Sequence, residues 1–377
     1  MKHSEFFPEI SGNLGFGCMR LPMKDGEVDS GEFCRMIDAF MTAGFNYFDT
    51  AHGYIGGKSE TTIRECLVKR YDRSRFLLTD KLTDPYFKCE ADIRPFFENQ
   101  LGWCGVEYFD FYLMHAQDKT NYEKFKRCRA YETALALKKE GLIRHFGISF
   151  HDKAEVLDRI LTEYPEIEAV QIQFNYVDYL DASVESKKVW EVCVAHGKPV
   201  IVMEPVKGGS LVRLPEEADK VLRDLGGCSN AGYALRFAAG FKNMTMILSG
   251  MSDMAQMEDN ISTMADFKPL DEKERAAIDE VCRIFKSRDL VPCTSCRYCV
   301  EENECPADIL IPDVFAALNA HETFHSWNTS FYYNSVLTKG HGKASDCLGC
   351  GGCEGVCPQH LPIRELLEKA AAVFDKK

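Results

Sequence analysis

The feature that most constrains the fold is a regular alternation of apolar, strand-like runs with stretches of helical period. Continuous apolar runs are typical of parallel strands that are buried on both faces. We expect strands at 13–21, 45–48, 76–81, 109–115, 143–149, 169–175, 199–203 and 244–250. We expect the intervening helices at 33–40, 60–70, 93–101, 122–139, 153–164, 183–196, 231–239 and 254–264. Eight such units over roughly 250 residues predict an α/β protein, a (β/α)8 TIM barrel.

A doubly wound sheet is the structural alternative. Such a sheet usually carries a glycine-rich phosphate-binding turn after its first strand. The corresponding stretch here, Gly15-Phe16-Gly17-Cys18, lacks the third glycine of that fingerprint. The barrel is therefore the favoured architecture.

The composition changes after a last amphipathic stretch at 271–286. From Pro292 onward, cysteines recur at short intervals, and a helical stretch at 311–321 separates two groups of them. We expect residues 1–287 to form the barrel and residues 288–377 to form a second, small domain. No low-complexity linker separates the two, so we expect them to pack together.

Charge and hydropathy exclude several classes of function. The chain of 377 residues has a formal net charge of −13 and no basic block, which argues against nucleic acid and anionic membranes as partners. No apolar run approaches the ~20 residues of a membrane span, and the start lacks the apolar core of a signal peptide. We expect a cytoplasmic protein.

The cysteines from Cys18 to Cys282 are expected to be reduced, buried thiols.

Ionisable side chains stand where three successive strands are expected to end. Asp49 and Tyr54 follow the second strand, Lys81 ends the third, and His115 ends the fourth. Each alone has an ordinary interpretation as a helix cap, a solvated cation or a structural histidine. The carboxyl ends of barrel strands meet at one mouth, however, so we expect these four side chains to converge there.

Four such groups together favour proton transfer to an oxygen. A Tyr has a reference pKa of about 10, and we expect the Lys81 ammonium to lower the pKa of Tyr54. Asp49 would hold Lys81 in place, and a neutral His115 would orient a carbonyl oxygen towards the phenol. The hydride that completes a carbonyl reduction must come from a cofactor, because no side chain supplies one.

At this point the chain resembles the aldo-keto reductase family over about residues 12–285. The resemblance is carried by the DTAHGY motif at 49–54, by Lys81 and by His115. Further matching motifs are Gly147-Ile148-Ser149, Gln171, and Ser249-Gly250 with Asp259-Asn260. It implies a (β/α)8 barrel, an extended NAD(H) or NADP(H) and a small carbonyl or alcohol substrate. Tyr54 would be the general acid/base, tuned by Lys81 and Asp49, with His115 orienting the substrate. The implied cofactor-binding residues are Ser149, Gln171, Ser249, Gly250, Asp259 and Asn260.

Three positions depart from the family pattern. Phe150 stands where the family often has Asn, and Met203 stands where an aromatic ring often stacks on the nicotinamide. The segment 249–260 contains acids but no Lys or Arg, although the 2′-phosphate of NADP calls for a cation. We therefore expect NADH to bind at least as well as NADPH.

The cysteine-rich region carries the most specific single pattern. Two runs, each with three cysteines at two-residue spacing and a fourth before a proline, resemble a dicluster ferredoxin of the α-helical type. Structural zinc usually uses two separated Cys-x2-Cys pairs and fits this spacing less well. The expected ligands of two [4Fe-4S] clusters are Cys293, Cys296, Cys299, Cys305, Cys347, Cys350, Cys353 and Cys357.

The resemblance also suggests how the ligands are shared. In runs ending in Cys-Pro, the fourth cysteine usually ligates the other cluster. Cys357 would then complete the cluster of the first triplet, and Cys305 that of the second. The gap before Cys305 is five residues rather than three, and two local clusters in sequence order are the alternative.

The two halves pose a question of coupling, since a nicotinamide exchanges hydride whereas a cubane cluster exchanges one electron. A flavin normally mediates between them, and a barrel mouth can bind one without a recognisable motif. The favoured hypothesis is an NAD(P)H-dependent carbonyl reductase with an appended cluster domain, for which an electron-carrier protein is a candidate partner. The alternatives are an electron-transfer protein that holds a flavin or a partner at the barrel mouth, and a redox sensor.

Overall fold

The computed structural model describes residues 4–181, 184–287, 290–324 and 327–375. Within these, the chain forms two compact units. The first comprises residues 4–181, 185–205 and 231–270, and the second comprises the described residues among 184, 206–230 and 271–375. No helix among the described residues combines the length and apolar character that a bilayer crossing requires.

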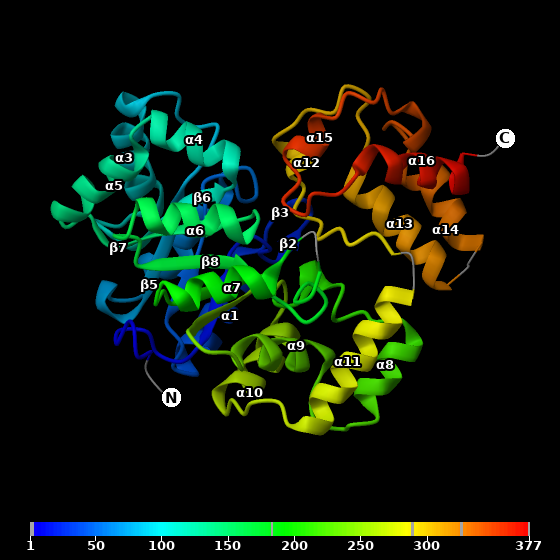
Figure 1. Cartoon of the computed structure of the whole chain (residues 1–377), viewed down its shortest axis with the longest axis horizontal. Helices are drawn as coiled ribbons and strands as arrows, with labels where there is room; N and C mark the ends of the chain where they lie inside the picture. Colours follow the sequence, from blue (N-terminus) through cyan, green and yellow to red (C-terminus); the bar gives the residue numbers. More distant parts are fainter. Residues whose placement is uncertain (1–3, 182–183, 288–289, 325–326, 376–377) are drawn as a thin grey trace. The chain divides into compact units, whose positions relative to one another are not determined.

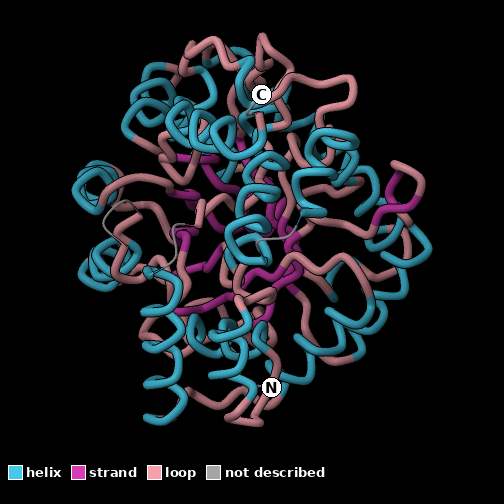
Figure 2. Tube along the Cα trace, turned by 90° about the vertical axis from the view of Figure 1, so that its right-hand side faces the viewer, coloured by secondary structure: helices cyan, strands magenta, loops and turns pink. Residues whose placement is uncertain are grey.

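The first unit is a closed barrel of eight parallel strands, as expected (Figures 1 and 2). Its order around the barrel is β1-β10-β9-β8-β7-β6-β5-β4, so neighbours in sequence are neighbours in space. The strand bounds are β1 Leu14–Gly17, β4 Tyr47–Asp49, β5 Leu77–Leu82, β6 Phe109–Gln117, β7 Ile143–Phe150, β8 Ala169–Gln173, β9 Val200–Met203 and β10 Met244–Ser249. In Figure 2 the strands lie inside and the helices surround them, which explains why whole strands such as β5 are buried along their entire length.

Helices of amphipathic period cover the barrel. They are α1 Ser30–Thr42, α2 Lys58–Ile63, α3 Glu90–Cys104, α4 Lys119–Arg127, α5 Ala130–Lys139, α6 Ala154–Glu163, α7 Ser186–Ala195, α9 Asn230–Ala239 and α10 Met254–Ala265. A short hairpin, β2 Met23–Lys24 with β3 Glu27–Val28, follows β1. At the amino-terminal end of the strands, Phe7 and Ile10 pack into an apolar cluster with Tyr47 and Phe111 and so close that end of the barrel.

Two expected helices differ from their sequence interpretation. The stretch 122–139 is two helices rather than one, because Arg129 takes a left-handed conformation with φ 54° that separates α4 from α5. The stretch 60–70 continues α2 as a π-helical turn, η1 Arg64–Val68, and stops there. The expected helix start at Ser183 lies outside the described residues, as does residue 288 at the expected domain boundary.

The second unit is helical. It contains η3 Lys207–Gly209, α8 Glu216–Arg223, α11 Glu272–Ser287, α12 Tyr298–Glu301, α13 Ile311–Phe324, α14 Trp327–Tyr332, η4 Tyr333–Leu337, η5 Ala344–Asp346, α15 Gly352–Gly355 and α16 Ile363–Phe374. Helices α8 and α11 pack side by side, and α13 packs on α16 around a buried core that includes Phe315, Leu318 and Leu367. Gly208 approaches the cysteine loop closely, since a Cβ there would lie 2.2 Å from the Thr294 carbonyl oxygen.

Candidate active site and cysteine loops

The four expected catalytic side chains stand at or beyond the carboxyl ends of neighbouring strands. Asp49 is the last residue of β4, and Lys81 and His115 lie near the ends of β5 and β6. Parallel pairing aligns Asp49 with Thr79, which places Lys81 two residues further along its strand. Tyr54 lies in the turn after β4, where its amide donates to the Ala51 carbonyl oxygen at 3.1 Å. The barrel therefore brings all four residues to one end.

Lys81 is the centre of this arrangement. Its ammonium is fully buried and donates to Asp49 Oδ1 at 2.6 Å, to the Thr50 carbonyl oxygen at 2.7 Å and to the Tyr54 hydroxyl at 3.2 Å. These bonds engage all three protons of the ammonium group. The second Asp49 oxygen accepts from Gln171 Nε2 at 3.0 Å, so Gln171 from β8 also holds the carboxylate.

The pKa of Tyr54 is raised in the structure and not lowered as expected. Burial is the largest cause, and the Asp49 and Asp80 carboxylates raise the pKa further, whereas Arg20 opposes them. The expectation counted the charge of Lys81 but not burial or the nearby carboxylates, one of which, Asp49, lies 2.6 Å from the Lys81 ammonium. These surroundings favour the protonated phenol.

His115 is buried beside Tyr54, with ring centroids 6.0 Å apart and nearly perpendicular planes. Burial lowers the pKa of His115 well below its ordinary value, and the charges of Lys81 and His151 lower it further. The ring is therefore neutral, as expected. The Thr83 hydroxyl lies 2.8 Å from His115 Nδ1 and fixes the ring orientation.

The residues expected to bind a cofactor fall into separate groups. Ser149 is buried at the end of β7, where its hydroxyl accepts from the Ala116 amide at 2.8 Å. Ser249 at the end of β10 accepts from Asn260 Nδ2 of α10 at 2.7 Å. Gly250 follows Ser249, and Asp259 precedes Asn260 on α10. Among the six, Gln171 contacts a member of the catalytic group, Asp49.

Two residues that the sequence interpretation missed belong to this end of the barrel. Arg20 lies beside Gly250, where a Cβ would be 3.6 Å from Arg20 Cβ, and its carbonyl oxygen accepts from Ser252 Oγ at 3.0 Å. Thr83 contacts His115. The signal for Arg20 was a cation near the end of the first expected strand, 13–21, and that for Thr83 was a hydroxyl two residues beyond Lys81.

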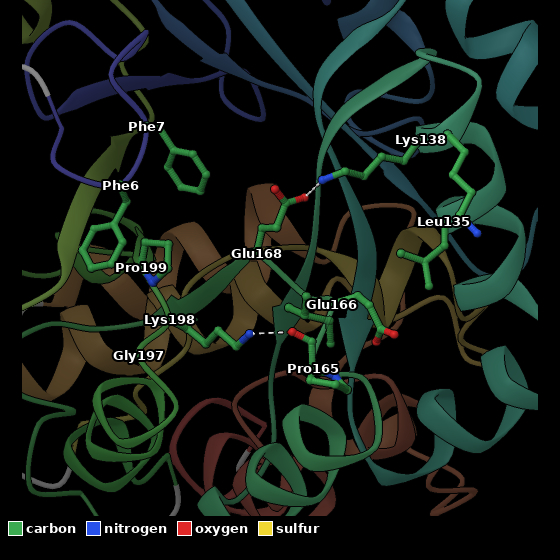
Figure 3. Close-up of a pocket in the computed structure, with 12 residues that line it drawn as sticks. Phe6, Phe7, Leu135, Lys138, Pro165, Glu166, Glu168, Gly197, Lys198 and Pro199 are labelled. Carbon is green, nitrogen blue, oxygen red and sulfur yellow. Dashed lines mark hydrogen bonds and ion pairs between the residues drawn. The ribbon is translucent and has the colours of Figure 1, made fainter.

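A separate hollow of about 710 Å³ opens at the opposite end of the barrel (Figure 3). Its lining includes Ile167 and Glu168 before β8 and Pro199 before β9. In Figure 3, Lys138 reaches Glu168, and Lys198 donates to the Pro165 carbonyl oxygen at 2.8 Å. Because these residues precede their strands, this hollow is distinct from the site around Lys81.

The eight cysteines from Cys293 to Cys357 line two cavities. One cavity is lined by Cys293, Cys296, Cys299 and Cys357, and the other by Cys305, Cys347, Cys350 and Cys353. The fourth cysteine of each run thus faces the triplet of the other run. Apolar side chains fill much of the remaining lining, and Ile311 borders both cavities. Four converging thiols in an apolar pocket fit the ligand demand of a cubane cluster.

The two cysteine runs are internal repeats of one backbone. Ser295 and Arg297 have positive φ values of 54° and 70°, and the equivalent Gly349 and Gly351 have 68° and 77°. Downstream, Asp308 and His360 each lie three residues after the Cys-Pro cysteine, with φ 51° and 50°. Helices α13 and α16 then begin at equivalent points. The longer gap before Cys305 is therefore absorbed without altering the repeat.

Comparison with known proteins agrees with this architecture. Residues 13–283 match the aldo/keto reductase family, and residues 292–361 match a 4Fe-4S dicluster domain. An uncharacterised oxidoreductase of Schizosaccharomyces pombe is 26% identical over 263 residues, which cover 67% of this chain and 81% of that protein. An uncharacterised oxidoreductase of Bacillus subtilis is 24% identical over 301 residues, covering 70% and 90% of the two chains.

Solved structures share the barrel. The holo form of an aldo-keto reductase from Bacillus halodurans has a TM-score of 0.60 at 24% identity, covering 74% of this chain and 95% of that chain. An aldo-keto reductase from Klebsiella pneumoniae in complex with NADPH has a TM-score of 0.59 at 19% identity, covering 71% and 90%. With the closed barrel, the family match over most of its length and the oxidoreductase relatives, the chain belongs to the aldo/keto reductase family of oxidoreductases and carries a C-terminal 4Fe-4S dicluster region.

Proposed function

We propose that the protein reduces the carbonyl group of a small molecule, or oxidises the corresponding alcohol, with Tyr54 as the general acid/base. The observation that carries this proposal is the buried Lys81 ammonium, which joins Asp49, the Thr50 carbonyl oxygen and the Tyr54 hydroxyl. A structural cation would need only a counter-charge. Here one of its three protons points at a phenol in the barrel mouth.

In the direction of reduction, Tyr54 donates its proton to the oxygen of the substrate. The raised pKa of Tyr54 keeps the phenol protonated, and the phenolate left after transfer is stabilised by Lys81 at 3.2 Å. Asp49 and Gln171 hold Lys81 so that it does not have to reorganise during the transfer. The group therefore functions as a positioned acid with its counter-charge already in place.

His115 orients the substrate oxygen. The Thr83 hydroxyl has one proton, which it can donate to His115 Nδ1 at 2.8 Å or to the Lys81 carbonyl oxygen at 3.3 Å. When it donates to the closer Nδ1, the single proton of the neutral ring resides on Nε2. An Nε2–H group can donate to a carbonyl oxygen, which an unprotonated nitrogen cannot do. His115 and Tyr54 would then bind the same oxygen from two sides.

A bound nicotinamide supplies the hydride for this reaction. The candidate residues for holding it are Ser149 and Gln171 near the nicotinamide end, and Ser249, Gly250, Asp259 and Asn260 near the adenine end. Their placement at the carboxyl ends of β7, β8 and β10 and on α10 supports this assignment. Arg20 beside Gly250 adds one cation to this stretch of the rim.

For the C-terminal region we propose two [4Fe-4S] clusters with crossed fourth ligands. Cys357 would complete the cluster of Cys293, Cys296 and Cys299, and Cys305 would complete that of the second triplet. The two cavities, each lined by one such set, support this pairing over two local clusters. These clusters would exchange single electrons with a carrier protein.

An electron-transfer protein or a redox sensor with a flavin at the barrel mouth is the second candidate. The two complete cysteine sets favour it, because hydride transfer from a nicotinamide does not require them. The Tyr54–Lys81 contact favours the reductase. A flavin band in the absorbance spectrum of anaerobically purified protein would support the second candidate.

The role of Tyr54 predicts a selective loss of catalysis. Replacing it by Phe removes the donor hydroxyl and keeps the ring, so we expect the rate of carbonyl reduction to fall about 10²- to 10⁴-fold with little change in cofactor affinity. Steady-state kinetics and cofactor fluorescence titration measure the two effects. Tyr122→Phe, which removes a hydroxyl bonded to Glu163 on the outer helices, is the control. Full activity of Tyr54→Phe would refute the assignment.

The charges near α10 predict the choice of cofactor. Asp253, Glu258 and Asp259 would face a 2′-phosphate with like charge, so we expect NADH to bind at least as tightly as NADPH. Fluorescence titration with both cofactors tests this expectation. An affinity for NADPH at least tenfold higher would contradict it, and Arg20→Gln would then report whether Arg20 is the cation responsible.

Crossed ligation predicts which variants share a phenotype. We expect Cys305→Ser to perturb the same cluster as Cys350→Ser, because both line one cavity, and Cys357→Ser to perturb the same cluster as Cys296→Ser. Electron paramagnetic resonance of the reduced variants distinguishes the two signals. If Cys305→Ser instead altered the signal affected by Cys296→Ser, ligation would be local and the crossed pairing wrong.

A further inference from the structure

Two carboxyl groups lie buried directly behind the catalytic strand. Asp80 precedes Lys81 on β5, and successive residues of a strand point to opposite faces, so Asp80 faces the helical layer while Lys81 faces the barrel interior. Glu60 reaches the same place from α2. Both side chains are fully buried. One oxygen of each and the Cys104 sulfur lie within 4.8 Å of one another.

The groups that donate to this pair are few and mostly neutral. Glu60 contacts His52 Nδ1 at 2.6 Å and accepts weakly from Gln100 Nε2 at 3.4 Å. Asp80 accepts from the Lys81 amide at 2.8 Å and from the Cys104 thiol at 3.7 Å. One oxygen of each carboxyl group lies within 4.8 Å of the other, and a hydrogen bond between the two groups requires a proton on one of them.

Gln100 ties this pair to the catalytic strand. Its Nε2 donates to the Lys81 carbonyl oxygen at 3.0 Å as well as to Glu60, and its Oε1 accepts from Tyr112 OH at 2.5 Å. The charge state of the pair is therefore set within one bonded network that includes the backbone of Lys81.

The surrounding groups leave the pair short of positive charge. Burial raises the pKa of the Tyr112 phenol on β6, of the Cys104 thiol on α3 and of the Cys18 thiol after β1. All three groups are therefore neutral. Burial lowers the pKa of His52, whose side chain is 19% exposed. The Lys81 ammonium is bonded to Asp49. Two carboxylates in such surroundings cannot both be ionised at low cost.

We propose that Glu60 and Asp80 hold two protons below neutral pH and share one above it, and that this change sets how much negative charge faces the Tyr54 phenol. The inference rests on the proposed role of Tyr54 as the acid. Both residues are positioning residues, since they act through the charge at the phenol and not by contact with substrate. Burial raises the pKa of Glu60 to about 7, whereas burial and the Glu60 charge raise the pKa of Asp80 well above its usual value, so the pair passes from two protons to one near neutrality.

The direction of the effect follows from charge. Below that titration, the pair carries two protons and no charge, so the developing Tyr54 phenolate meets less negative charge and proton donation is easier. As the pH rises through about 7, the pair loses one of the two protons, and the added negative charge opposes phenolate formation. Carbonyl reduction should therefore become slower by roughly three- to tenfold across neutral pH.

The test is the pH profile of single-turnover carbonyl reduction in the wild type, Asp80→Asn and Glu60→Gln. We expect the fall near neutrality in the wild type and a flat profile in Glu60→Gln, which keeps the side-chain shape but removes the group that titrates near 7. Asp80→Asn should keep a fall with pH, because Glu60 remains buried and ionisable. Glu168→Gln is the matched control, because Glu168 is also bonded to a histidine, His145, but lies at the other end of the barrel. It should keep the wild-type profile.

A second readout does not depend on turnover. Difference infrared spectra across neutral pH should show the carbonyl stretch of a protonated carboxylic acid disappearing in the wild type and absent from the Asp80→Asn, Glu60→Gln double variant. An unchanged neutral inflection in Glu60→Gln, or loss of the infrared band only in Glu168→Gln, would overturn the inference. Those outcomes leave the Tyr54 assignment intact, since Tyr54→Phe tests it separately.

Discussion

The buried Lys81 ammonium is the interaction on which the rest of the site depends. Taking a cation out of water costs several kcal/mol, and the cost is recovered only when counter-charge and acceptors are complete. Asp49 supplies the charge, the Thr50 carbonyl oxygen and the Tyr54 hydroxyl supply the other acceptors, and Gln171 holds Asp49. Lys81 comes from β5, and its partners come from β4, the turn after β4 and β8, so a slip in the register of any of these strands would leave a charge uncompensated.

Much of the architecture is accessible from sequence because its causes are local or periodic. Apolar runs separated by amphipathic helices indicate the barrel, and polar residues at the ends of those runs indicate its mouth. Asp49, Lys81 and His115 could be named on that basis. The cysteine spacing indicates the second unit in the same way, because the number of residues between the cysteines determines whether their thiols can bind one cluster together.

The features that the sequence did not predict depend on which residues lie close together in the folded structure. The direction of the Tyr54 pKa shift is set by burial and by Asp80, a residue on the outer face of β5 that no periodic pattern connects with Tyr54. Arg129 interrupts an otherwise helical stretch through one backbone conformation. The insertion at 206–230 groups with the helical unit and not with the barrel that precedes and follows it in sequence. Long-range packing decides each of these features.

Hydride chemistry at the barrel mouth and one-electron chemistry at the cysteine loops make different demands, and the central claim is that carbonyl reduction uses the first. Reduction of an accepted carbonyl with nicotinamide deuterated at C4 tests this most directly. The account predicts one deuterium on the former carbonyl carbon of the product, detected by mass spectrometry, with cluster signals that do not change during turnover. Product free of deuterium, with cluster signals that bleach at the rate of turnover, would contradict it.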